Sequence, residues 1–282
     1  MSDAIFRCGI TRSIAGALHS CMSVVLFLFM IAMTIDLVLI EPNWIEVTRH
    51  EVPGPLDPPL KIAHVTDLHT QGLGYRERSM LALLDREQPD LIVVTGDIIA
   101  NHHTLETTRV VLERLHAPLG VWVVRGNWEN SLRKPVAQQR AYYKAAGATF
   151  LLNGARQVRE GVWIVGFDDA ASGWPELHAA LKDIPQGAFT IALFHAPGYF
   201  SQVAGHCQLA FAGHTHGGQV RLPFVTPFWL PRGCGRFIAG WYEEQGSRLY
   251  VSRGIGMSTL PIRFLCRPEL AIITVGTRSH QD

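Results

Sequence analysis

KIAHVTD at residues 61–67, DLIVVTGD at residues 90–97 and VWVVRGN at residues 121–127 are three apolar stretches that each end in polar residues. Each stretch is rich in β-branched residues and has the length of a strand. The segments between them, residues 76–88 and 104–116, carry apolar residues at helical spacing. Alternating strands and helices of this kind predict βαβ units and a largely parallel sheet.

The second half of the chain is richer in predicted strands. One helix is expected near residues 175–184. Two packed sheets flanked by helices would accommodate both halves, so we predict an α/β domain over residues 61–282. The expected strands of the second half are residues 163–169, 189–197, 209–218, 248–256 and 269–275.

An apolar segment precedes this domain. Residues 14–35 contain no Asp, Glu, Lys or Arg and would form a helix about 33 Å long, enough to cross a bilayer. We predict a transmembrane anchor at residues 13–40 after a short tail at residues 1–12. The alternatives are a cleaved signal peptide and a buried core helix. Residues 41–60 are rich in proline and are predicted to form a linker or an edge segment.

The charges around the apolar segment predict its orientation. Arg7 and Arg12 precede it, whereas Asp36, Glu41 and Glu46 are among the residues that follow. The positive-inside rule then places the N-terminus in the cytoplasm and the domain on the non-cytoplasmic face. Because the bias consists of two arginines, the cytoplasmic face stays open as the alternative.

The composition argues against several classes of protein. With 48% hydrophobic and 17% charged residues, the chain is typical of a globular domain and not of a disordered one. A net charge of +1 without a basic cluster predicts no nucleic-acid partner. The five cysteines lack CxxC spacing, so neither a disulfide framework nor a zinc knuckle is expected. The oligomeric state is left open.

Residues with metal-binding side chains lie at the ends of five of the predicted strands. Because ligands collect outside the carboxyl ends of strands in open α/β sheets, these side chains would meet in one crevice. Carboxylate, imidazole and amide donors without a thiolate suit Mn, Fe or Zn better than Ca or Mg. The candidate ligands are Asp67, His69, Asp97, Asn127, His195, His214 and His216.

Seven such residues are enough for two neighbouring divalent metal ions. Two ions about 3.5 to 4 Å apart can clamp the attacking and leaving oxygens of an in-line displacement. One bridging carboxylate is required, and Asp97 is the candidate. A single motif of this kind is more often a turn cap, but five in order, each at a strand end, favour a metal centre.

These motifs resemble the ordered series of the calcineurin-like metallophosphoesterases. The resemblance covers the chain from about Lys61 onward, and GHTHGGQVRLP (213–223) and YVSRGIG (250–256) are similar to a membrane-anchored or exported bacterial branch. It implies a four-layer α-β-β-α sandwich, in which helices flank two mixed β-sheets, and a single-pass protein of the bacterial inner membrane. The residues that carry it are Asp67-Leu68-His69, Gly96-Asp97, Gly126-Asn127-Trp128-Glu129, His195 and Gly213-His214-Thr215-His216.

The resemblance also implies a role for each candidate ligand. A metal-bound water or hydroxide would be the nucleophile, and Asp97, Asn127 and His195 would be catalytic. Carried over by motif, one ion would be bound by Asp67, His69 and His216 and the other by Asn127, His195 and His214, with Asp97 as the bridge.

Trp128 departs from the pattern of the family. Many relatives have a histidine there that can protonate the leaving oxygen, and an indole cannot deliver a proton. Loss of such an acid costs about 10²- to 10⁴-fold for a poor leaving group. We therefore expect activated phosphodiesters or anhydrides such as pyrophosphates to be cleaved in preference to simple alkyl monoesters. Glu129 is expected to orient the loop or Asn127.

The combined prediction is a metal-dependent phosphodiesterase or pyrophosphatase. Its substrate would be a phosphate-containing small molecule or a lipid-linked compound, such as the UDP-diacylglucosamine-type precursor of lipid A that some similar enzymes hydrolyse. That substrate requires a cytoplasmic domain, against the orientation predicted from charge. The alternative is a non-catalytic metal-binding scaffold or sensor with the same fold.

Several other residues have two interpretations. His64 is expected to be structural, and His102 and His103 to be solvated residues at a helix entry. TPFWLP at 226–231 is either an apolar lip or part of the core. The arginines that could bind phosphate or have ordinary structural roles are Arg125, Arg232, Arg253 and Arg263.

Overall fold

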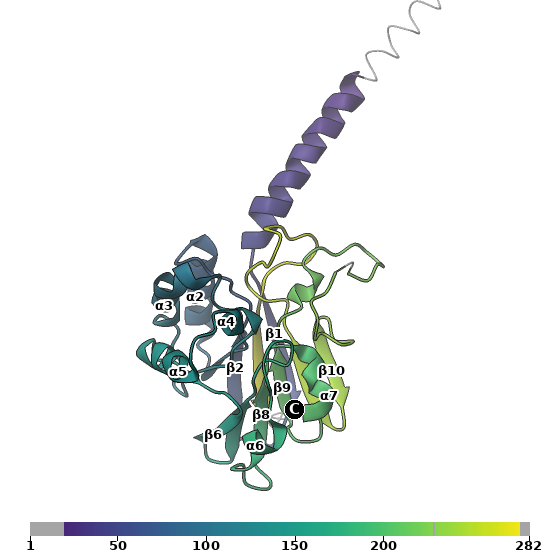
Figure 1. The fold of residues 1–282 in the computed structure, drawn as a ribbon. Helices are drawn as coiled ribbons and strands as arrows, with labels where there is room; N and C mark the ends of the chain where they lie inside the picture. The colour runs from purple at the N-terminus through teal and green to yellow at the C-terminus, as the bar shows by residue number, and fades with distance from the viewer. Residues whose placement is uncertain (1–19, 228, 277–282) are drawn as a thin grey trace, which may run out of the picture.

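Two six-stranded β-sheets pack face to face in the computed structural model, which describes residues 20–227 and 229–276. Helices cover the outer face of each sheet (Figure 1). The four-layer arrangement of two mixed sheets flanked by helices, expected from the sequence, is confirmed.

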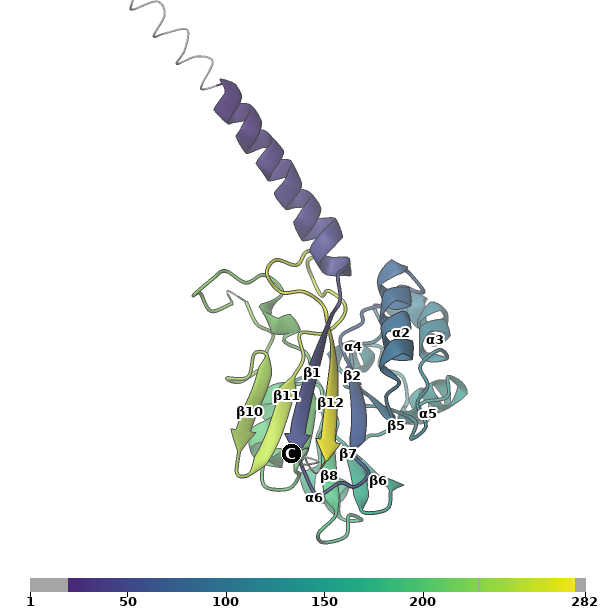
Figure 2. The same cartoon turned by 180° about the vertical axis from the view of Figure 1, so that it is seen from behind.

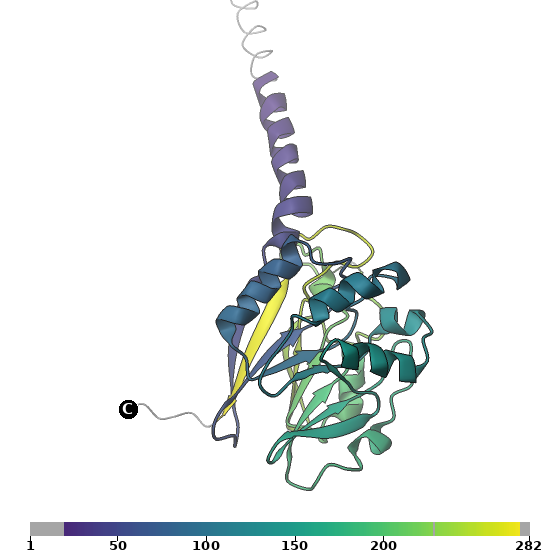
Figure 3. The ribbon, with the colours of Figure 1, turned by 90° about the vertical axis from the view of Figure 1, so that its left-hand side faces the viewer.

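The first sheet contains β1 (Glu46–Pro53), β2 (Leu60–Val65), β3 (Leu91–Val94), β4 (Val121–Val123), β5 (Thr149–Phe150) and β12 (Glu269–Gly276). Its order is β1-β12-β2-β3-β4-β5. Strands β2 to β5 are parallel to one another, whereas β12 is antiparallel to β2 and parallel to β1. Figure 3 shows the helices on its outer face, which are α2 (Tyr75–Glu87), α3 (Leu105–Leu112) and α5 (Val136–Ala145).

The second sheet contains β6 (Gly154–Arg159), β7 (Val162–Gly166), β8 (Phe189–Leu193), β9 (Leu209–Ala212), β10 (Gly240–Glu244) and β11 (Ser247–Val251). Its order is β10-β11-β9-β8-β7-β6, with antiparallel pairs at both edges and parallel pairs between them. Helices α6 (Leu177–Leu181) and α7 (Phe200–Val203) cover its outer face. The short helices are α4 (Asn127–Ser131), η3 (His102–Thr104), η4 (Pro197–Tyr199) and η5 (His216–Gly218).

Pleat alternation distributes the side chains of each strand between two cores. In β2, Ile62 packs between the sheets, whereas Ala63 and Val65 pack beneath the helices. Strands β3, β8 and β9 are buried along their whole length, because both of their faces are covered. This explains why they appear in the sequence as continuous apolar runs.

His64 lies on the inter-sheet face of β2, against Phe211. Its Nε2 atom is 2.8 Å from Thr95 Oγ1, and burial lowers its pKa to about 3. His64 therefore packs as a neutral residue inside the domain, away from the candidate ligands.

The first sheet begins before Lys61, the start expected from the sequence. Strand β1 pairs with β12 from Glu46, opposite Glu269, to Pro53, opposite Gly276. A proline is tolerated there because β1 is an edge strand. The strand is only partly buried and contains charged residues, so it lacks the apolar run by which the other strands were predicted.

An apolar helix spans Ser20–Asn43 and stands away from the domain (Figures 1 and 2). It ends in a π-helical turn, η1 (Asp36–Ile40), and a 3-10 turn, η2 (Glu41–Asn43). The most apolar part of this helix has a mean hydropathy of 2.6, and none of its residues is buried. It is therefore not a core helix of this domain, one of the alternatives considered above. Arg7, Arg12 and the start of the predicted anchor lie outside the described residues.

Candidate metal centre

The candidate ligands lie just beyond the carboxyl ends of parallel strands in the two sheets. Asn127 differs from the expected position, because it is the first residue of α4 and lies beyond the end of β4. The structure nevertheless brings all seven side chains together. Of the other six, Asp67 and His69 follow β2, Asp97 follows β3, His195 follows β8, and His214 and His216 follow β9.

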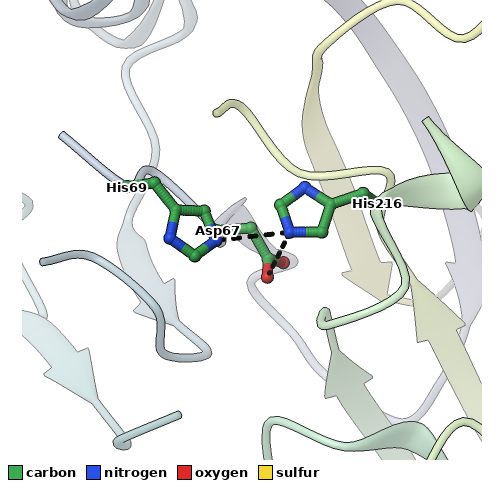
Figure 4. A group of neighbouring side chains, drawn as sticks. All are labelled: Asp67, His69 and His216. Carbon is green, nitrogen blue, oxygen red and sulfur yellow. Dashed lines mark hydrogen bonds and ion pairs between the residues drawn. The ribbon is translucent and has the colours of Figure 1, made fainter. Parts of the chain in front are cut away.

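The first group of ligand atoms comes from Asp67, His69 and His216 (Figure 4). The Nε2 atoms of the two histidines are 3.3 Å apart, and that of His216 is 3.5 Å from Asp67 Oδ1. All three residues are buried. Two imidazoles and a carboxylate therefore converge on a space the size of a cation.

The second group is centred on His195. Its Nε2 atom lies 3.2 Å from Asp97 Oδ2, 3.1 Å from Asn127 Oδ1 and 2.9 Å from His214 Nδ1. Its Nδ1 atom is 2.7 Å from the carbonyl oxygen of Thr95. In the neutral ring, Nδ1–H donates to that oxygen and Nε2 keeps its lone pair for a metal.

His214 is oriented in the same way with its two nitrogens exchanged. Its Nε2 atom is 2.8 Å from the carbonyl oxygen of Arg232 and donates to it, which leaves Nδ1 as the metal-binding atom. Both histidines thus present lone pairs to the same point.

Asp97 connects the two groups. Its Oδ2 atom lies 3.7 Å from His69 Nε2 in the first group and 3.2 Å from His195 Nε2 in the second. Its Oδ1 atom accepts a hydrogen bond of 2.9 Å from the backbone N–H of Trp128. One oxygen is therefore held by the protein, and the other lies within 3.7 Å of a histidine from each group.

Glu129 is buried and acts on the backbone instead of the ligand atoms. Its carboxylate accepts hydrogen bonds of 2.8 to 3.1 Å from the N–H groups of Asp97, Ile98, Ile99 and Gly126. It thus ties the loop after β3 to the start of α4. It lies outside both groups of ligand atoms.

Five of the seven candidate ligands have a left-handed backbone conformation, which is uncommon for residues other than glycine. Such conformations cost about 1 to 3 kcal/mol each and persist where the surrounding structure imposes them. The five are Asp67 (φ 52°), His69 (φ 40°), Asp97 (φ 51°), His214 (φ 72°) and His216 (φ 50°).

Two glycines allow the loops to approach the carboxylates. A Cβ atom on Gly213 would lie 2.3 Å from Asp67 Oδ2, and one on Gly126 would lie 2.2 Å from Asp97 Oδ1. A residue with a Cβ atom at either position would displace a candidate ligand. This steric constraint explains why glycine precedes Asn127 and His214.

The electrostatics of the groups favour a bound cation. Burial raises the pKa of Asp67 to about 7 and lowers that of His69 to about 4. Desolvation opposes charge on His195, but the Asp97 carboxylate outweighs it and raises the pKa of the ring well above its usual value. Divalent ions would compensate the buried carboxylates and keep the imidazoles neutral. The donor set therefore fits divalent metals.

The four arginines considered for phosphate binding have different positions. Arg125 forms a two-pronged ion pair with Asp168, at 2.7 and 2.8 Å. Arg253 pairs with two glutamates, and Arg263 is fully buried against backbone carbonyls. Arg232 is exposed, and the structure shows no ion pair for it among the residues described. Of these four arginines, only Arg232 is free of an ion pair or buried contacts within the described part of the chain and could bind a phosphate near the metal centre.

The Trp128 ring packs edge-on against His69, with 4.9 Å between ring centroids. It is partly exposed beside the first group of candidate ligands. His102 and His103 lie in the exposed turn η3, outside both ligand groups.

We predict that Glu129→Gln lowers the affinity for Mn²⁺ by about 10- to 100-fold, because an amide nitrogen would face backbone N–H groups and release the Asp97 loop. Calorimetric titration of the metal-free protein measures this. The matched control is Glu106→Gln on the exposed side of α3, which should bind Mn²⁺ like the unmodified protein. Unchanged affinity in Glu129→Gln would contradict the role given to this carboxylate.

Comparisons with known proteins point to one family. The model of the calcineurin-like phosphoesterase family matches residues 60–218, which include all seven candidate ligands. The chain is 32% identical over 250 residues to the metallophosphoesterase YkuE of Bacillus subtilis, covering 84% of this chain and 87% of that protein. It is 28% identical over 254 residues to the phosphodiesterase YaeI of Escherichia coli, with coverages of 83% and 89%. A metallophosphoesterase of Aquifex aeolicus is 27% identical over 238 residues, with coverages of 78% and 87%. The chain therefore belongs to the calcineurin-like phosphoesterase family, and it is a metal-dependent phosphoester hydrolase.

Proposed function

We propose that this hydrolase uses two divalent ions to cleave phosphodiester or pyrophosphate bonds in a membrane-associated substrate. The observation that carries the proposal is the position of Asp97 Oδ2, within 3.7 Å of one ligand group and 3.2 Å of the other. A shared carboxylate is what two ions a few ångströms apart require.

In this proposal each residue keeps the role expected from its motif. When bound, the ions would activate water near neutral pH and offset the negative charge that builds up on phosphate oxygens. Imidazole, carboxylate and amide donors favour Mn, Fe or Zn. One ion would be held by Asp67, His69 and His216, the other by Asn127, His195 and His214, and both by Asp97.

The chain itself supplies orientation. The carbonyl oxygens of Thr95 and Arg232 fix the tautomers of His195 and His214, so both rings enter the reaction as neutral donors of lone pairs. Glu129 and the backbone N–H of Trp128 hold Asp97 in place. None of these groups has to reorganise as charge develops, which is the basis of electrostatic preorganisation.

Trp128 supports the choice of diesters and anhydrides. Its indole lies against His69. At the position of Trp128, many relatives have a histidine that can protonate a leaving oxygen. Substrates with good leaving groups need little protonation, so they would lose least from this replacement.

The apolar helix supports a membrane-associated substrate, because its length and hydropathy suit a bilayer span. A UDP-diacylglucosamine-type lipid is one such substrate, and it requires the domain to face the cytoplasm. The alternative to catalysis is a metal-binding scaffold or sensor with the same fold.

Asp97→Asn is expected to lower the hydrolysis of bis-p-nitrophenyl phosphate at least about 10²-fold in the presence of Mn²⁺, because an amide cannot bridge two cations as a carboxylate does. The full chain in detergent is assayed beside Asp85→Asn, an exposed residue of α2 that should leave activity unchanged. Absence of turnover in the unmodified chain at full metal occupancy would favour the scaffold.

Trp128→His is expected to accelerate the hydrolysis of an alkyl phosphodiester by about 10²-fold or more, and to change that of bis-p-nitrophenyl phosphate much less. The reason is that an imidazole supplies the proton that only the poor leaving group needs. Trp128→Phe serves as the control for the change in packing against His69. Equal effects of Trp128→His on both substrates would contradict the account of leaving-group preference.

A further inference from the structure

Six exposed apolar side chains gather on two neighbouring loops beside the metal centre. Phe224 is fully exposed, and Trp229 and Leu265 are more than half exposed. Soluble proteins rarely expose large apolar patches without a partner. We call the six residues the apolar lip: Leu222, Phe224, Val225 and Trp229 on the first loop, and Leu260 and Leu265 on the second.

The lip is attached to the base of the apolar helix. Phe264 forms a β-bridge with Val220, and its carbonyl oxygen accepts a hydrogen bond of 2.8 Å from Arg221 N. The next residue, Leu265, donates its N–H to the carboxylate of Glu41, at the end of the helix, over 2.9 Å. Figures 1 and 2 show the loops of this region clustered where the helix leaves the domain.

A second contact reaches further into the helix. The N–H of Arg263 donates to the carbonyl oxygen of Leu37 over 3.1 Å. Since Leu37 lies in the last turns of the candidate span, the second loop sits at the level where a spanning helix would leave the bilayer.

The same loops border the metal centre. Gln219, just before the lip, donates its N–H to the carbonyl oxygen of His216 over 3.0 Å. Arg232, just after it, accepts the hydrogen bond that orients His214. The loop that carries most of the lip thus starts just after His216, a candidate ligand of one metal, and ends at Arg232, whose carbonyl oxygen holds His214, a candidate ligand of the other.

The residues around the lip are those favoured at the surface of a membrane. Trp44, at the exit of the helix, is exposed, and the guanidinium of Arg267 lies 4.0 Å from its ring centroid. Arg221 and Arg232 flank the apolar part of the first loop. Tryptophan belongs at the level of lipid headgroups, and arginine pairs there with anionic lipid phosphates.

We propose that the apolar lip inserts into the bilayer that the N-terminal helix enters, so that the metal centre works at the depth of the lipid phosphates. Its continuity with the helix identifies a lipid surface as the occupant, in preference to a second copy of the chain or a soluble protein. The substrate would be a lipid whose headgroup is joined by a phosphodiester or pyrophosphate bond. This inference rests on the proposed hydrolase activity.

Contact with lipid can be measured directly. In the full chain with Cys8→Ser and Cys21→Ser, a bimane fluorophore is attached at Phe224→Cys or, as control, at Trp174→Cys. Trp174 is exposed and lies on the connection between β7 and α6, outside the lip. The remaining cysteines are buried. In phosphatidylcholine and phosphatidylglycerol vesicles with brominated acyl chains, the fluorophore at position 224 should be quenched and that at 174 should not. No quenching at position 224 would overturn the proposal, and a loss of its solvent exposure that depends on protein concentration would indicate a second copy instead.

The consequence for activity is tested with two substrates that share one leaving group. One is a diacylglyceryl p-nitrophenyl phosphate in the vesicle, and the other is soluble bis-p-nitrophenyl phosphate. In both, water adds to phosphorus, the P–O bond to p-nitrophenolate breaks, and the other substituent keeps the phosphate.

The double variant Phe224→Ser with Trp229→Ser should lower turnover of the lipid substrate at least about tenfold, because membrane binding scales with inserted apolar area. Turnover of the soluble diester should stay within about twofold of the unmodified chain, since both side chains are exposed and neither is a candidate ligand. Trp174→Ser is the matched control. If the double variant cleaves the lipid at the normal rate, the lip proposal is wrong. If the unmodified chain cleaves neither substrate, the proposed function itself fails.

Discussion

The carboxylate of Asp97 is the point on which the rest of the structure depends. One oxygen is fixed by the backbone of Trp128, and the other faces a histidine from each ligand group. Without a compensating cation, burying carboxylates and imidazoles this close together costs free energy of folding. The left-handed turns, the glycines without room for a Cβ atom and the buried Glu129 all serve to hold this arrangement. The two-sheet sandwich supplies the stability that such a strained centre requires.

Much of the fold could be predicted because the central strands are covered on both faces. Strands β3, β8 and β9 therefore appear as apolar runs of strand length, and α2 and α3 show helical spacing. Residues 41–60 were predicted only as a linker or an edge segment, and strand β1 was not predicted there because an edge strand with charged side chains has no such run. Helix α5 was also missed: its segment VAQQRAYYKA has few apolar residues and buries only Gln139 and Tyr143.

The candidate ligands could be found from the sequence because each follows a strand and the strand ends meet at one edge. What the sequence could not provide were contacts between residues far apart in the chain. An orienting role for Glu129 was expected from its motif, but its hydrogen bonds to the loop after β3 were not, and Arg125 forms an ion pair with Asp168, forty-three positions further along. The residue types give only a weak signal for the left-handed conformations, since Asp and His adopt them more often than most residues but far less often than glycine. The proposed insertion of the lip would add a further constraint, because it would bring the metal centre to the bilayer that the helix enters.

The central claim is that one carboxylate joins two metal ions, and the magnetic state of the Mn²⁺-loaded full chain tests it most directly. Electron paramagnetic resonance combined with metal analysis should show two Mn²⁺ per chain with exchange-coupled spins, as expected for ions about 3.5 to 4 Å apart. A single ion per chain, or two ions with uncoupled spectra, would contradict the account.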